Sequence, residues 1–254
     1  MAKAKTDPRP AAFITGAGQG IGAEIALRLA IDGHDVALGW NSKEPREVVA
    51  KIEATGARAV PVKLDIRSQP DIAAGIGKAA EALGGLDVLV NNAGVTLRQL
   101  AIDVTPDEWQ TVLDCNLTGT FFMCQHMARH LLADKRPGCI VNIASTHGVV
   151  ALAQRSTYGI SKAGIIHMTR MLAYEWAEHG IRVNAVAPGL VETPSRAEYF
   201  GQRPDARQAM VERVPMGRFA SEQDVAGAVA YLVSADSGYV TGHTLMLDGG
   251  LTAY

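Results

Sequence analysis

Short apolar runs alternate with longer helix-like segments along almost the whole chain. Strands are predicted at 11–15, 36–40, 59–64, 86–90, 139–143, 182–186 and 245–247. Between them, apolar residues recur at helical spacing, as in 21–31, and glycine ends some of these segments, as at Gly56 and Gly180. Repeated strand and helix units favour a parallel sheet with right-handed crossovers and helices on both faces. The sequence therefore predicts an α/β fold with a doubly wound parallel sheet.

The composition agrees with one domain of this kind. The 254 residues are 48% hydrophobic and 20% charged, which is typical of a globular chain that folds by itself. No linker-like or repeated segment interrupts the pattern. We therefore expect a flexible tail over residues 1–10 and one domain over residues 11–254.

Charge, hydropathy and cysteine usage exclude several function classes. The 24 basic and 26 acidic residues are mixed without a long run of one sign, so we expect no nucleic-acid partner. No apolar stretch approaches the ~18 residues of a spanning helix, and the first residues lack the apolar core of a signal peptide. Cys115, Cys124 and Cys139 have no disulfide or metal-ligand spacing. We expect a cytoplasmic protein with no membrane association and no metal.

Residues 194–216 break the alternation most densely. Pro194, Gly201, Pro204 and Pro215 separate charged helical fragments there. A long irregular segment in a compact fold often covers a ligand. We predict a substrate lid at about 194–216, with 149–154 as the opposite wall.

A glycine-rich turn, TGAGQGIG at 15–22, lies between the first strand and the first helix. Glycines let the backbone approach a pyrophosphate, whose charge is favoured by the free N–H groups at a helix start. An ordinary turn, or the loop of a methyltransferase or a nucleotide-sugar enzyme, gives a similar pattern. Its position nevertheless favours nucleotide binding.

Tyr158 and Lys162 are four residues apart in the long helical segment that Gly180 ends, so they lie on one helix face. An adjacent ammonium favours the phenolate form of a tyrosine, whose usual pKa is about 10. Alone, the pair is common by chance. However, Ser145 follows the strand at 139–143, and an Asn-Asn-Ala-Gly sequence at 91–94 follows the strand before it. Both therefore lie at the carboxyl edge of the sheet, where doubly wound folds bind ligands.

With these residues in order, the chain resembles the classical short-chain dehydrogenase/reductase family over almost all of its length. The match comprises the Thr-Gly-x-x-x-Gly-x-Gly loop at 15–22, Asp65, the Asn-Asn-Ala-Gly of 91–94, Asn116, Ser145, Tyr158, Lys162, Pro188-Gly189 and Thr193. The resemblance implies a single-domain Rossmann-type fold. It also implies an NAD(P)-dependent oxidoreductase that interconverts a ketone and a secondary alcohol.

The resemblance implies a catalytic role for Asn116, Ser145, Tyr158 and Lys162. Tyr158 would be the general acid and base, and Ser145 would orient the carbonyl. Lys162 would lower the pKa of Tyr158 and hold the nicotinamide ribose, while Asn116 would position water in a proton relay. The implied cofactor-binding residues are Thr15, Gly16, Gly18, Gln19, Gly20, Ile21, Gly22, Trp40, Asn41, Ser42, Asp65, Ile66, Asn92, Ala93, Gly94, Tyr158, Lys162, Pro188, Gly189, Val191 and Thr193.

The choice of cofactor follows from the end of the second predicted strand. An NAD-selective site has an acidic residue there, which would repel a 2′-phosphate. This chain has Trp40, followed by Asn41, Ser42 and Lys43, whose side chains can donate to a phosphate. NADP(H) is therefore expected rather than NAD(H), although Gln19 stands where NADP-dependent relatives often carry a basic residue.

Several alternatives stay open at this point. The resemblance extends to 3-oxoacyl carrier-protein reductases and to sugar or polyol dehydrogenases. Lys135 and Arg136 could meet an acidic carrier protein, but Tyr174 replaces a basic residue that such reductases often carry. A non-catalytic dinucleotide-sensing protein would keep the loop and lose the reacting residues. Family resemblance also implies a homotetramer, with 239–250 packed at an interface.

Overall fold

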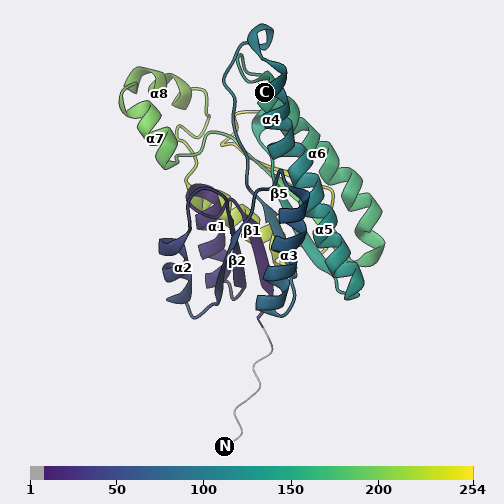
Figure 1. The fold of residues 1–254 in the computed structure, drawn as a ribbon. Helices are drawn as coiled ribbons and strands as arrows, with labels where there is room; N and C mark the ends of the chain where they lie inside the picture. The colour runs from purple at the N-terminus through teal and green to yellow at the C-terminus, as the bar shows by residue number, and fades with distance from the viewer. Residues whose placement is uncertain (1–8, 254) are drawn as a thin grey trace, which may run out of the picture.

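The computed structural model describes residues 9–253, apart from the side chain of Ser195. Its centre is one sheet of seven strands, all paired in parallel, in the order β3-β2-β1-β4-β5-β6-β7 (Figure 1). The strands are β1 (Ala11–Thr15), β2 (Asp35–Trp40), β3 (Ala59–Lys63), β4 (Val88–Asn91), β5 (Gly138–Ile143), β6 (Ile181–Pro188) and β7 (Thr244–Leu247). The predicted doubly wound parallel sheet is confirmed.

Helices cover both faces of the sheet (Figure 1). One face carries α1 (Gly20–Ile31), α2 (Arg46–Glu53) and α9 (Glu222–Val233); the other carries α3 (Gln69–Leu83), α5 (Gly119–Ala133) and α6 (Ser156–Trp176). Side chains alternate along each strand, so Ala12 and Ile14 pack toward α1 and α9 while Ala11 and Phe13 pack toward α3 and α5. Both cores are therefore apolar, as expected for a parallel sheet buried on two sides.

Shorter elements complete the fold. They are η1 (Ala101–Asp103), α4 (Pro106–Leu113), η2 (Asp114–Thr118), η3 (Thr146–Gly148), η4 (Ala177–His179), α7 (Pro194–Gly201), α8 (Pro204–Val211) and η5 (Ala235–Ser237). Within residues 9–253, no helix is long and apolar enough to cross a membrane. The same residues contain no cluster of His, Cys, Asp and Glu suited to a metal ion.

The segment 194–216 differs from its prediction as an irregular stretch. It folds into α7 and α8, which stand together beyond α1 and away from the sheet (Figure 1). Pro194 and Pro204 begin these helices, and Thr193 caps the first by accepting the N–H of Arg196 at 3.3 Å. Proline is well suited to the first helical position, because its missing N–H has no partner there in any case. The prolines thus mark helix starts rather than irregular chain.

Arg9, near the end of the predicted flexible tail of residues 1–10, is hydrogen-bonded to the domain. Arg9 donates from Nε to the carbonyl of Gly33 at 3.0 Å and from Nη1 to the carbonyl of Gly56 at 2.7 Å. These two carbonyls follow α1 and α2, so Arg9 ties the start of β1 to the ends of both helices. Residues 1–8 of the predicted tail lie outside the described residues.

Candidate active site

Two cavities open along the carboxyl edge of the sheet, where the strand order reverses between β1 and β4. The loop cavity, of about 410 Å³, is bounded by the glycine-rich turn and the ends of β2 and β3. The tyrosine cavity, of about 300 Å³, is bounded by Ser145, Tyr158 and the segment that leads into α7. A parallel sheet binds ligands at such a reversal, because adjacent loops diverge to opposite faces.

The glycine-rich turn is held by the end of β4. Thr15 Oγ1 accepts the backbone N–H groups of Asn92 and Ala93 at 3.0 Å each. Asn92 Nδ2 donates to the carbonyls of Thr15 and Gly16 at 3.1 and 3.2 Å. A Cβ at Gly22 would lie 2.4 Å from the Gly16 carbonyl oxygen, so only glycine lets α1 approach the turn. Asn92 therefore braces the turn.

Most of the predicted cofactor-binding residues lie in one or other cavity. The loop cavity is lined by Thr15, Gly16, Gly18, Gln19, Trp40, Asn41, Ser42, Asp65, Ile66, Ala93 and Gly94, and the tyrosine cavity by Ile21, Tyr158, Pro188, Gly189, Val191 and Thr193. Gly20, Gly22, Asn92 and Lys162 do not line either one. These four are placed beside the cavities, where they shape or support the walls.

The loop cavity fits a dinucleotide. Gln19 gives α1 no side-chain cap, so the first N–H groups of that helix are free for an anion. Lys43 and Arg67 also line this cavity. Arg67 donates from Nε to Asp65 Oδ1 at 2.9 Å and thereby lowers the pKa of that carboxyl. Sequence reasoning missed Arg67, for which the available signal was a cation two residues after Asp65.

Tyr158 and Lys162 lie on one face of α6, as predicted. Lys162 Nζ is 5.7 Å from the centre of the Tyr158 ring and donates to the carbonyl of Ile143 at 2.7 Å. The lysine is only 4% exposed. Burial disfavours its charged form and lowers its pKa to about 8. The positive charge of Lys162 is therefore less favourable here than at the protein surface.

Ser145 reaches Tyr158 because η3 packs directly on α6. A Cβ at Gly148 would lie 2.8 Å from the backbone carbonyl carbon of Lys162, so glycine permits this contact. Ser145 is buried, and its Oγ accepts the N–H of His147 at 3.2 Å. The His147 ring in turn meets the Tyr158 ring edge to face, with centroids 6.2 Å apart. The predicted pair of Ser145 and Tyr158 thus shares the tyrosine cavity.

The pKa of Tyr158 differs from its prediction. Burial raises the pKa of the phenol, while the Ser145 hydroxyl and the charges of Arg155 and Arg196 act in the opposite direction. Lys162, which was expected to lower the pKa of Tyr158, is not among the groups that shift it. In this structure the ammonium of Lys162 is bound to the Ile143 carbonyl, and burial outweighs the favourable charges.

Asn116 is fully buried in η2, a π-helical turn between α4 and α5. Its Nδ2 donates to the Val95 carbonyl at 2.9 Å and to Ser161 Oγ at 3.0 Å, and its Oδ1 accepts the Val95 N–H at 2.8 Å. Such π-turns are frequent at functional sites. The side chain joins the segment after β4 to α6, so Asn116 positions the helix that carries Tyr158.

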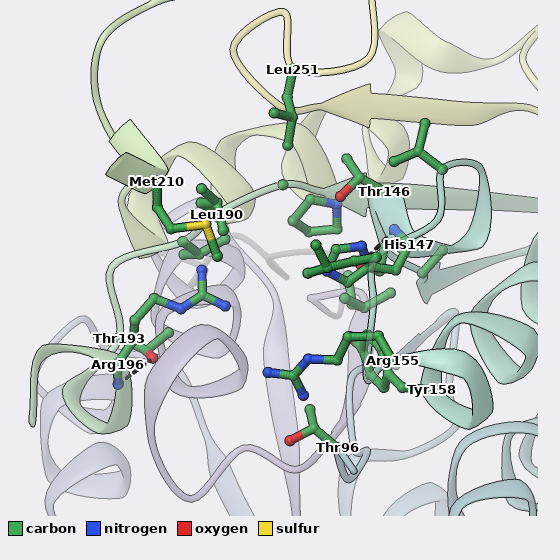
Figure 2. A pocket seen from close by; sticks show the side chains of 18 of the residues that line it. Thr96, Thr146, His147, Arg155, Tyr158, Leu190, Thr193, Arg196, Met210 and Leu251 are labelled. Atoms are coloured by element: carbon green, nitrogen blue, oxygen red, sulfur yellow. Dashed lines mark hydrogen bonds between the residues drawn. The ribbon is translucent and has the colours of Figure 1, made fainter. Parts of the chain in front are cut away.

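Three arginines line the tyrosine cavity: Arg155 before α6, Arg196 in α7 and Arg213 after α8. Figure 2 shows Arg155 and Arg196 extending toward the same space from opposite walls. The predicted lid at 194–216 contains Arg196 and Arg213, but sequence reasoning missed Arg155. Arg155 is three residues before Tyr158, which was the available signal.

Known proteins resemble this chain over nearly its full length. A model of the family described as enoyl-(acyl carrier protein) reductase matches residues 16–252. The chain is 41% identical over 243 residues to 3β-hydroxysteroid dehydrogenase 1 of Eggerthella lenta, covering 95% of this chain and 93% of that protein. These matches span both cavities.

Solved structures agree in fold. A candidate short-chain alcohol dehydrogenase from Sinorhizobium meliloti 1021 has a TM-score of 0.92 and 42% identity, over 96% of each chain. A candidate 2-deoxy-D-gluconate 3-dehydrogenase from Agrobacterium tumefaciens, solved with bound NADP, has a TM-score of 0.87 and 36% identity, over 98% of this chain and 100% of that one. The chain therefore belongs to the short-chain dehydrogenase/reductase family and is an NAD(P)-dependent oxidoreductase that interconverts a ketone and a secondary alcohol.

Proposed function

We propose that Tyr158, Ser145 and Lys162 carry out this interconversion in the tyrosine cavity, with NADP(H) held along the loop cavity. The observation that carries the proposal is the meeting of Ser145 and Tyr158 in one cavity, with Lys162 one helical turn away. The non-catalytic alternative has no support, because the full set of reacting side chains is present.

The nicotinamide cofactor supplies or accepts the hydride when it is bound. The chain supplies orientation and proton transfer. Ser145 Oγ donates to the substrate carbonyl oxygen, and Tyr158 Oη gives that oxygen its proton during reduction. During oxidation Tyr158 accepts the same proton from the alcohol. Lys162, whose Nζ lies 5.7 Å from the centre of the Tyr158 ring, would hold the nicotinamide ribose beside the reacting hydroxyl.

The environment of Tyr158 suits both directions. Burial raises its pKa and keeps the phenol protonated at neutral pH, as reduction requires. Arg155 and Arg196 favour the phenolate by their charge, which is the form that oxidation requires. Asn116 acts through α6, because its amide joins Ser161 to the backbone of Val95.

Substitution of Tyr158 tests this assignment. Tyr158→Phe removes the transferring oxygen and should lower kcat by roughly 10²- to 10⁴-fold, while NADPH binding measured by fluorescence titration is preserved. Tyr231→Phe, on α9 and away from both cavities, is the control. A kcat of Tyr158→Phe close to that of the wild type would show that another group transfers the proton.

The preference for NADP(H) is supported by the charges of the loop cavity. Lys43 and Arg67 line it, and its carboxylate, Asp65, is paired with Arg67. Trp40 stands where an acidic residue would repel the 2′-phosphate. The Agrobacterium structure with bound NADP agrees with this choice. We expect kcat/KM to be higher with NADPH than with NADH, and the reverse order would refute the preference.

The segment 194–216 is proposed as a lid over the tyrosine cavity. Arg196, Met210 and Arg213 line that cavity, which supports the assignment. Hydrogen exchange of α7 and α8 should slow when cofactor and substrate bind together. Equal exchange with and without these ligands would identify a passive segment.

A homotetramer is proposed from the family resemblance and from exposed apolar side chains. Phe121, Leu132 and Met171 on α5 and α6 are 38%, 40% and 52% exposed and border one groove. Light scattering should give about four times the chain mass of 26.9 kDa, and a monomer mass would exclude the assembly. A cytoplasmic location is also proposed, since all three cysteines are free thiols.

A further inference from the structure

The tyrosine cavity has an unbalanced charge. Arg155, Arg196 and Arg213 line it together with His147, and none of its described lining residues is Asp or Glu. Burial and the charge of the neighbouring Arg155 lower the pKa of Arg196. Burial also lowers the pKa of His147. The carboxylate of Glu192 acts on Arg196 by its charge, but it pairs with Arg207 and does not line the cavity. The wall beside the reacting tyrosine therefore carries positive charge without a carboxylate of its own.

These arginines also lack the carboxylate partners that neighbouring arginines have, although Arg155 donates from Nη1 to the carbonyl of Leu97 at 3.3 Å. In the same part of the chain, Arg207 pairs with Glu192 at 2.8 Å and Arg218 pairs with Asp224 at 2.7 Å. Within residues 9–253, by contrast, Arg155, Arg196 and Arg213 form no salt bridge. The contrast shows that acidic residues are available in this segment but are not directed into the cavity.

Arg196 carries the clearest sign of a missing partner. Its Nη1 is buried and has no hydrogen-bond partner among the described residues. A buried donor without a partner costs about 1–3 kcal/mol, and more when it is charged. A guanidinium offers paired N–H groups that match a carboxylate or phosphate. A ligand with such a group would satisfy Arg196 and relieve its repulsion from Arg155.

We propose that the substrate is an oxo or hydroxy compound bearing an anionic group, a carboxylate or a phosphate, which Arg155 and Arg196 bind while Ser145 and Tyr158 hold the reacting oxygen. The inference rests on the proposed function and narrows its substrate class. It requires the anion and the reacting carbon to belong to one molecule, because both arginines and both reacting residues line one cavity.

Matched substrates test the inference. One arm compares a short 3-oxo acid with its methyl ester, and the other compares dihydroxyacetone phosphate with dihydroxyacetone, with NADPH absorbance as the readout. In at least one arm, we expect kcat/KM to be about tenfold higher, or more, for the anionic compound than for its neutral counterpart. This is the effect of one hydrogen bond to a charged group. The arm with the larger ratio identifies carboxylate or phosphate. Equal or better turnover of both neutral members would overturn the inference and leave the proposed function intact.

Arginine variants locate the anion. Arg196→Gln and Arg155→Gln should each lower the ratio of anionic to neutral turnover by about tenfold or more, and a ratio cancels any general loss of folded enzyme. Arg203→Gln is the matched control, because Arg203 lies on the same segment but is exposed and contacts Tyr199. An unchanged ratio with a raised KM for NADPH would show that these arginines hold the cofactor instead. Absence of turnover with every ketone would count against the proposed function itself.

Discussion

The two cavities are built in different ways, although they share one edge of the sheet. The loop cavity is formed by turns that directly follow β1, β2, β3 and β4, and hydrogen bonds between Asn92 and Thr15 join the turns after β1 and β4. Its carboxylate, Asp65, already has a partner in Arg67. The tyrosine cavity instead joins segments far apart in the chain, from Ile21 to Leu251, and its three arginines form no salt bridge within residues 9–253.

This difference separates a preformed site from one that a ligand completes. In the loop cavity the turns after β1 and β4 are braced and Asp65 is paired with Arg67 before binding, and the first N–H groups of α1 are left for the cofactor. In the tyrosine cavity, Nη1 of Arg196 and Nδ1 of His147 are buried and have no hydrogen-bond partner in the described part of the chain. The first kind of site suits a cofactor common to many enzymes, while the second suits a particular substrate. The following predictions test this contrast, beginning with the largest expected effect.

Lys162→Met should have the largest effect, because Lys162 is assigned both to Tyr158 and to the nicotinamide ribose. We expect kcat to fall by roughly 10²-fold or more and NADPH to bind more weakly. Lys78→Met, on the exposed side of α3, is the control. Steady-state kinetics with the preferred ketone give the answer. Activity near the wild-type level would remove Lys162 from the mechanism.

The same variant should change how stability depends on pH. The pKa of Lys162 falls from 10.5 to about 8 in the folded state, so between these values the unfolded chain binds more protons and wild-type stability rises with pH. The gain is about 3 kcal/mol. Urea unfolding at several pH values should show this rise in the wild type and its loss in Lys162→Met. Parallel curves for both proteins would contradict the lowered pKa.

Gly22→Ala tests the preformed character of the loop cavity. The added Cβ would lie 2.4 Å from the Gly16 carbonyl oxygen, and such overpacking costs about 1–3 kcal/mol. NADPH affinity should fall as well, since the turn must move. Gly77→Ala is a matched control in α3, where a Cβ meets nothing within 4 Å. It should instead stabilise the protein by about 0.5–1 kcal/mol. Equal effects of the two variants on unfolding would contradict the tight approach.

Trp40→Asp should shift the cofactor preference. A carboxylate at the end of β2 accepts from the ribose hydroxyls of NAD(H) and repels a 2′-phosphate. We expect the ratio of kcat/KM for NADPH over NADH to fall by about tenfold, the size of one interaction with a charged group. Trp40→Asn separates the charge from loss of the indole ring. A shift of the same size with Asn would show that the ring sets the preference.

Arg196→Gln should have the smallest effect on the ligand-free protein. It removes a half-buried cation that forms no salt bridge within residues 9–253, so the melting temperature should stay the same or rise slightly. If the protein itself stabilised the charge of Arg196, the melting temperature of Arg196→Gln would instead be several degrees lower than that of the wild type. The same measurement with an anionic substrate analogue should show less stabilisation in the variant than in the wild type.

Some features of the site were predictable because they depend on local pattern. The turn at 15–22 and the pair of Tyr158 and Lys162 follow from glycine placement and helical spacing. The two short helices of 194–216 were less visible, since their prolines are equally typical of irregular chain. Bracing by Asn92 also required the structure, because its partners precede it by more than seventy residues.

The sequence by itself determined the parallel sheet and the edge at which its motifs gather. Strand and helix periodicities are local, and a βα repeat allows few topologies. Tertiary structure alone decided which charges meet. The ammonium of Lys162 binds the Ile143 carbonyl, and Arg155, Arg196 and Arg213 converge on one cavity. Such contacts depend on how distant segments pack, and burial then sets the pKa of each group.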